Sequence, residues 1–113
     1  MAQVPLVAAI DAIALVSDGK GWLLDVREPH EWDAGHAEQA HSLPMSQIQD
    51  RFGELPTDEP LIVVCQAGYR SSRVTAALID AGYDATNVDG GMLSWVQAGG
   101  DLVAEGDDSP RVV

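Results

Sequence analysis

Cys65 is the only cysteine of the chain, and its position makes it a candidate nucleophile. It follows a short apolar run over 61–64 that does not alternate with polar residues, a pattern that predicts a strand buried on both faces of a parallel sheet. Beyond Arg70, apolar residues recur at three- and four-residue spacing up to a stop signal at Gly82, which predicts a helix that begins near Ser71. The thiol therefore lies in a tight loop between a strand and a helix.

The loop Gln66-Ala67-Gly68-Tyr69-Arg70 has features that lower the pKa of a thiol. Gly68 can take a positive φ without a Cβ clash, so the loop can turn sharply into the helix. The backbone N–H groups of such a loop converge on one point and attract an anion, and Arg70 and Arg73 add positive charge. We therefore expect a depressed pKa for Cys65 and a thiolate that is available near neutral pH.

The composition limits the class of protein. With 113 residues the chain fits a single domain, and one cysteine excludes an internal disulfide framework. Eighteen acidic against six basic residues give a formal charge of -12, which repels phosphate backbones and anionic membranes. No apolar stretch approaches the ~20 residues of a membrane span, and the opening residues lead us to expect no secretory leader. We expect a cytoplasmic protein that binds neither nucleic acid nor a membrane.

Strand and helix patterns alternate along the chain, which predicts an α/β domain with a mainly parallel sheet covered on both faces. The expected strands, besides the one before Cys65, are Trp22–Val26, Ala40–Leu43 and Ala85–Val88. The expected helices, besides the one after the loop, are Leu6–Val16, Glu28 to Gly35, Met45–Leu55 and Met92 to Gly99. The single domain spans 1–113, with a core of about 5–102 and a frayed tail over 103–113.

Four blocks of sequence give the chain a specific resemblance. They are 23–29 with Glu31, Gly35-His36 followed by Ala40, the cysteine segment 65–72, and Asp89-Gly90-Gly91 with Trp95. In this order and spacing, from about Pro5 to about Leu102, the chain resembles the single-domain rhodaneses, a sulfurtransferase family that carries sulfur as a cysteine persulfide. The resemblance implies a five-stranded, mostly parallel sheet flanked by helices, and transfer of sulfane sulfur from thiosulfate or a similar donor.

The resemblance also assigns roles to residues. Cys65 is the catalytic residue that accepts the sulfane sulfur, and the persulfide and the anionic donor are held by Gln66, Ala67, Gly68, Tyr69, Arg70 and Ser71. Asp25, Arg27 and Arg73 are expected close to the loop, and the first two are either catalytic or a structural ion pair that fixes a strand end. Gln66 stands where some thiosulfate-preferring relatives have a basic residue, so the physiological donor stays open.

The expected partners are a small anionic sulfur donor and, as the acceptor, a thiol or a sulfur-carrier protein. A cysteine-dependent phosphatase or arsenate reductase uses a similar cradle with five residues between Cys and Arg, but only four stand here. A non-catalytic rhodanese binding module would typically lack the cysteine, and a redox sensor would need a resolving cysteine. No metal or cofactor is expected, since His30, His36 and His41 lack an accompanying cysteine or carboxylate cluster.

Overall fold

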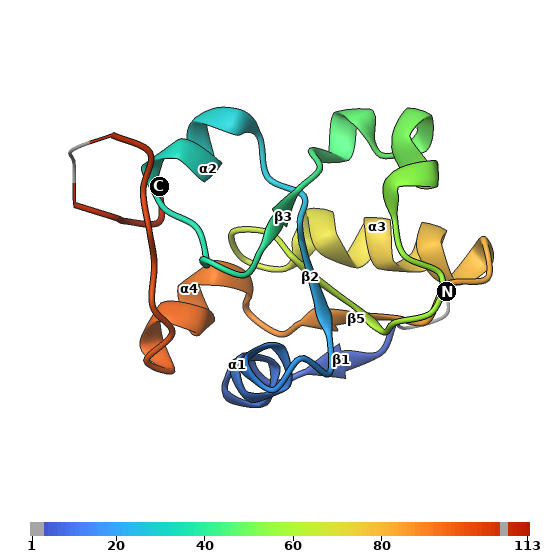
Figure 1. Cartoon of the computed structure of the whole chain (residues 1–113), viewed down its shortest axis with the longest axis horizontal. Helices are drawn as coiled ribbons and strands as arrows, with labels where there is room; N and C mark the ends of the chain where they lie inside the picture. The colour runs from blue at the N-terminus through green and yellow to red at the C-terminus, as the bar shows by residue number, and fades with distance from the viewer. Residues whose placement is uncertain (1–3, 107–108) are drawn as a thin grey trace.

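β4 (Leu61–Val64) lies at the centre of the sheet, and all four of its residues are buried. The computed structural model describes residues 4–106 and 109–113, and within them five parallel strands pair in the order β1-β5-β4-β2-β3 (Figure 1). The other strands are β1 (Leu6–Val7), β2 (Trp22–Asp25), β3 (His41–Ser42) and β5 (Ala85–Val88). The predicted five-stranded α/β sheet and the buried strand before the cysteine are confirmed.

Helices cover both faces of this sheet (Figure 1). They are α1 (Ala9–Ser17), α2 (Pro29–Ala34), α3 (Tyr69–Asp80), α4 (Gly91–Gln97) and the 3₁₀ helices η1 (Met45–Gln47) and η2 (Gln49–Glu54). Because strand side chains alternate, Leu61 and Val63 face α3 and the 3₁₀ helices, whereas Ile62 and Val64 face α1 and α4. Cys65 lies on the α3 side. None of the helices in the described residues is long and apolar enough to cross a membrane.

The carboxyl ends of β2, β4 and β5 lie at one edge of the sheet. β2 and β5 flank β4, and both run parallel to it. The segments that follow these strands begin at Val26, Cys65 and Asp89, so residues far apart in the sequence become neighbours. This edge is where open parallel α/β sheets usually bind ligands.

Two helix predictions are wrong in extent. The sequence predicts a helix over Leu6–Val16, but its first two residues form β1 and α1 begins at Ala9. Two residues are too few to show a periodicity, and pairing with β5 fixes them instead. In place of the predicted helix Met45–Leu55 the chain forms two 3₁₀ helices, η1 and η2, and η2 is itself kinked at Arg51, which has the non-helical angles φ -122° and ψ 17°.

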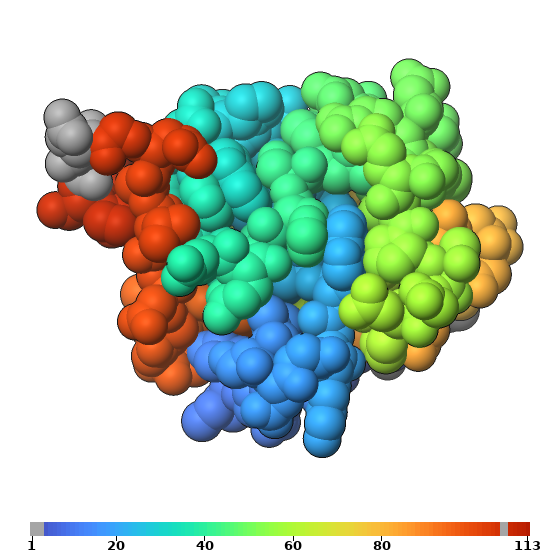
Figure 2. Space-filling view, in the orientation of Figure 1, coloured from blue at the N-terminus to red at the C-terminus, as the bar shows by residue number. Residues whose placement is uncertain are grey.

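The described part of the tail contacts the domain, in contrast to the frayed tail expected over 103–113. Val103 forms an antiparallel bridge with His36, and the N–H of Arg111 donates to the Ala34 carbonyl at 2.9 Å. Val112 packs against the core on the side of α1 and α4. Figure 2 shows this red segment against α2. These contacts are made mostly by the backbone, so the acidic composition did not reveal them; residues 107 and 108 lie outside the described part.

We expect Gly35→Ala to displace this tail. A Cβ on the buried Gly35 would lie 2.6 Å from the backbone nitrogen of Arg111, so one of the two segments must move. The loss of stability should be about 1–3 kcal/mol, the usual range for overpacking. Thermal unfolding and the rate of proteolysis within the tail measure the effect.

Gly53→Ala is the matched control, because a Cβ on Gly53 meets no atom within 4 Å. Its unfolding temperature should not fall. If both variants unfolded at the wild-type temperature and their tails were cleaved at the wild-type rate, docking of the tail would be refuted.

Candidate active site

The sulfur of Cys65 lies among hydrogen-bond donors at the carboxyl end of β4. The residue is 1% exposed, and its Sγ accepts from the N–H of Gly68 at 3.1 Å and lies 3.2 Å from the Oγ of Ser71. Gly68 is the N-cap of α3 and has φ 109°, so the chain turns back over the sulfur within three residues. A side chain at this φ would be strained, which is why the loop needs glycine there.

These donors hold the pKa of the Cys65 thiol below its ordinary value. Burial by itself raises that pKa, since it disfavours the charged sulfur. The hydroxyl and the N–H of Ser71, together with the N–H groups of Gly68 and Ala67, outweigh burial because they stabilise the thiolate. The predicted depressed pKa is therefore confirmed. The predicted backbone N–H groups of the loop are among its causes together with the Ser71 hydroxyl, whereas the loop arginines, which were also expected to contribute, are not among the main causes.

The first turn of α4 holds the carbonyls of this loop. The N–H groups of Met92 and Leu93 donate to the carbonyl oxygens of Cys65 and Gln66 at 2.8 and 3.1 Å. A planar trans peptide points its N–H opposite to its carbonyl, so the N–H groups of the same peptides face away from α4. Gly91 permits the close approach: it has φ 61°, and a Cβ there would lie 2.5 Å from both carbonyl oxygens.

Asn87 of β5 supports the loop from the neighbouring strand, and the sequence analysis did not predict it. It is 3% exposed. Its Nδ2 donates to the Gly68 carbonyl at 3.1 Å, and its Oδ1 accepts from the hydroxyl of the fully buried Ser71 at 2.6 Å. The available signal was an amide, a poor strand former, inside a predicted buried strand, where a polar group needs partners.

A bidentate ion pair joins the end of the loop to α2. Nη1 and Nη2 of Arg70 donate to the two carboxylate oxygens of Glu31 at 2.7 and 2.8 Å. The Arg70 hydrogen bond holds the pKa of Glu31 below its usual value although burial opposes it, and Glu31 raises the pKa of Arg70. The Cys65 sulfur also favours the charged Arg70. Glu31 was quoted in a motif but not predicted as a site residue, because 39 residues separate it from Arg70.

Asp25 and Arg27 form a buried ion pair at the end of β2. The Nε and Nη2 of the fully buried Arg27 donate to both carboxylate oxygens of Asp25 at 2.8 to 3.2 Å. Nη2 also donates to the Gly35 carbonyl at 2.8 Å, which ties β2 to the end of α2. Both carboxylate oxygens of Asp25 are therefore engaged by Arg27, whereas the buried Nη1 of Arg27 has no protein partner among the described residues.

The side chains of three other predicted residues point elsewhere. Arg73 is exposed and lines a groove between α3 and residues 45–50. Tyr69 is 83% exposed. The side-chain amide of Gln66 donates to the Val113 carbonyl oxygen at 2.7 Å, in the docked tail. Only the backbone of Gln66 and Tyr69 can therefore act on the sulfur in this arrangement.

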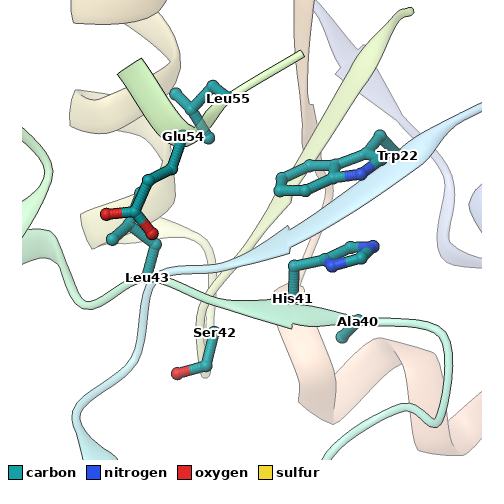
Figure 3. Close-up of a pocket in the computed structure, with 7 residues that line it drawn as sticks. All are labelled: Trp22, Ala40, His41, Ser42, Leu43, Glu54 and Leu55. Atoms are coloured by element: carbon teal, nitrogen blue, oxygen red, sulfur yellow. The ribbon is translucent and has the colours of Figure 1, made fainter. Parts of the chain in front are cut away.

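A hollow of about 420 Å³ lies along the edge strand β3 and is lined by Trp22, residues 40–43, Glu54 and Leu55 (Figure 3). Trp22, which begins β2, and His41 stack in it with ring centroids 3.9 Å apart. His36 stacks in the same way on Trp32, at 3.6 Å. Across residues 4–106 and 109–113, no group of three or more His, Cys, Asp or Glu side chains is placed to hold a metal ion. Two of the three histidines, His36 and His41, thus stack on tryptophan rings, and His30 is exposed.

Gly91→Ala tests whether α4 orients the loop. The new Cβ would collide with the carbonyl oxygens of Cys65 and Gln66, so we expect the loop peptides to turn and the thiolate to lose N–H donors. Alkylation of Cys65 by iodoacetamide near neutral pH should slow by about tenfold or more, the effect of one hydrogen bond to a charged group.

Gly19→Ala is the matched control, because Gly19 also has a positive φ, 71°, but a Cβ there meets no atom within 4 Å. It should lose stability and keep the wild-type alkylation rate. Equal alkylation rates in the two folded variants would contradict the role given to α4.

The sequence has relatives among known proteins. The uncharacterized protein YqhL of Bacillus subtilis (strain 168) is 39% identical over 77 residues, which cover 67% of this chain and 61% of YqhL. A sulfurtransferase of Allochromatium vinosum is 36% identical over 83 residues, which cover 73% of this chain and 78% of that protein. The alignment with YqhL thus spans less than two thirds of its length.

The fold has relatives among solved structures. The crystal structure of a rhodanese-related protein from Thermoplasma volcanium matches with a TM-score of 0.84 and 29% sequence identity, over 89% of this chain and 99% of that one. The sequence pattern of the rhodanese-like domain matches residues 8–98. This range includes the cysteine loop, the Asp25–Arg27 and Glu31–Arg70 ion pairs, and the first turn of α4 that binds the loop carbonyls. The chain therefore belongs to the rhodanese-like domain family.

Proposed function

We propose that this protein is a sulfurtransferase that carries sulfane sulfur on Cys65. The observation that carries the proposal is the Sγ of Cys65, which accepts hydrogen bonds from the loop at the carboxyl edge of the sheet and has a depressed pKa. Its thiolate attacks the outer sulfur of thiosulfate or a similar donor. A new S–S bond forms to Cys65, and the S–S bond of the donor breaks. For thiosulfate, sulfite leaves with the bonding electrons.

In the second half of the reaction an acceptor removes the sulfur. A nucleophile attacks the outer sulfur of the persulfide, and the Cys65 thiolate leaves with the electrons of the broken S–S bond. Cyanide as the acceptor gives thiocyanate in an assay. In the cell we propose that the acceptor is a thiol or a sulfur-carrier protein. The N–H groups of the loop stabilise the anionic persulfide as an oxyanion hole stabilises oxygen.

The length of the loop favours sulfur over phosphate. Four residues separate Cys65 from Arg70, one fewer than in the cysteine phosphatases described above. Arg70 is also tied to Glu31 at its far end, which limits how far its guanidinium can wrap around a ligand. A shorter, tethered loop suits one sulfur atom beside Sγ better than a tetrahedral oxyanion.

The anionic donor finds few free positive charges at the site. Arg70 uses two of its five N–H donors on Glu31, so the others can hold the donor anion. Gln66 contributes no charge next to the cysteine, and its side chain is engaged with Val113. Thiosulfate is therefore proposed as the test donor, and the physiological donor is to be found among small sulfane-bearing anions.

Intact mass spectrometry tests the persulfide. After thiosulfate treatment the wild-type mass should rise by one sulfur atom, and cyanide should restore the original mass. Cys65→Ser should show neither change, because a serine hydroxyl is not ionised near neutral pH, while its circular dichroism stays that of wild type. Formation of thiocyanate by Cys65→Ser at a rate near wild type would refute the mechanism.

Arg70→Ala should lower kcat/KM for thiosulfate by about tenfold or more, since a charge-assisted hydrogen bond to the donor is lost. Arg73→Ala is the matched control on the same helix, and it should cost much less because Arg73 is exposed on a different groove. Both rates are measured with cyanide as the acceptor. A larger loss in Arg73→Ala than in Arg70→Ala would overturn the assignment.

A further inference from the structure

Ser71 has one hydroxyl proton and two acceptors within reach. Its Oγ lies 2.6 Å from Asn87 Oδ1 and 3.2 Å from Cys65 Sγ. A hydroxyl offers a single donor, so Ser71 can donate fully to only one of them at a time. The amide of Asn87 is held by the Nδ2 bond to the Gly68 carbonyl, which keeps Oδ1 directed at Ser71.

We propose that Asn87 is a positioning residue that acts on Cys65 through Ser71, by competing for the Ser71 hydroxyl proton. While the sulfur is protonated, Asn87 accepts this proton, and the Oγ of Ser71 can accept from the S–H. When the sulfur becomes a thiolate or a persulfide anion, the hydroxyl turns to it, because a charged acceptor forms the stronger hydrogen bond. The consequence for sulfur transfer rests on the proposed function, whereas the competition itself does not.

The burial of the three groups makes this competition effective. Cys65, Ser71 and Asn87 are 1%, 0% and 3% exposed, so water has little access to replace a missing partner. A change in the hydrogen bonding of one group therefore alters the hydrogen bonding of the other two. Asn87 decides how much of the Ser71 hydroxyl is available to the sulfur, and thereby how readily the thiolate forms.

The charged groups around the sulfur are the same in wild type, Asn87→Leu, Ser71→Ala and the double variant, which form the double-mutant cycle. β4, β5 and α4 carry no titratable side chain within their bounds. The neighbouring loops and helices contribute the ion pairs Asp25–Arg27 and Glu31–Arg70, and Glu28 also acts on Arg70; none of these groups is changed in the cycle. A change in reactivity that depends on both Ser71 and Asn87 therefore reports the hydroxyl and not a titrating neighbour.

A double-mutant cycle measures the competition without any sulfur donor. The rate of Cys65 alkylation by iodoacetamide is followed from acid to alkaline pH for wild type, Asn87→Leu, Ser71→Ala and the double variant. Leucine is close in size to asparagine but cannot accept a proton. Ser71→Ala should slow alkylation near neutral pH about tenfold, since the thiolate loses a donor.

Asn87→Leu should raise the alkylation rate when Ser71 is present. This increase should exceed the change that the same substitution causes in the Ser71→Ala background by about threefold or more. Loss of the bond to Gly68 affects both backgrounds and cancels. Asn87→Asp should have the opposite sign, because a carboxylate holds the hydroxyl proton more strongly, and its effect should also shrink with Ser71→Ala. Thr86→Val, on the adjacent β5 position that faces the other way, should keep the wild-type profile.

Equal effects of Asn87→Leu in the two backgrounds would overturn the proposal, since Asn87 would then act only by holding Gly68. If Asn87→Asp fails to fold by circular dichroism, the leucine cycle alone decides. Coupled alkylation rates without any sulfur transfer would refute the proposed function and leave this inference standing. If wild type transfers sulfur but the effects of Asn87→Leu and Ser71→Ala on alkylation are independent, this inference is refuted and the proposed function stands.

Discussion

Two hydrogen bonds from the first turn of α4 decide which way the peptides of the cysteine loop face. The N–H groups of Met92 and Leu93 hold the carbonyls of Cys65 and Gln66, so those carbonyls cannot turn toward the sulfur. A carbonyl turned inward would repel a thiolate, whereas an N–H stabilises it. The reactivity of Cys65 thus depends on a contact with a helix that contains no charged residue.

The parallel sheet makes this contact available. β5 lies beside β4, so the chain that leaves β5 turns at Gly90 and Gly91 directly over the loop that leaves β4. α3 starts within the loop on one face of the sheet, and α4 clamps it from the other face. Glu31 from α2 and Asn87 from β5 then fix its far end and its middle. Five elements meet at one thiol, although the loop itself is only a few residues long.

The features that could be predicted from the sequence are those set by residues close together in the chain. A buried strand, a glycine with positive φ and a helix start follow from neighbouring residues, so the place of Cys65 and its depressed pKa were both predictable. What the sequence could not predict depends on pairing across the sheet. Asn87 becomes a partner of Ser71 only because β5 lies beside β4. β1 and the docked tail are fixed by backbone hydrogen bonds to distant segments, and neither carries a side-chain pattern of its own.

The charges of the two ion pairs at the site nearly cancel, although the sequence analysis expected Arg70 and Arg73 to add positive charge there. Arg27 is paired with Asp25, and Arg70 is paired with Glu31, so each cation that reaches the site brings its own carboxylate. An approaching anion therefore meets little net charge there, and at a distance it meets a chain of formal charge -12. Attraction must come from N–H dipoles, whose field falls off faster than that of a charge. The site is thus built to stabilise an anion already in hydrogen-bond contact, such as the thiolate or a sulfur bonded to it, rather than to draw anions from solution.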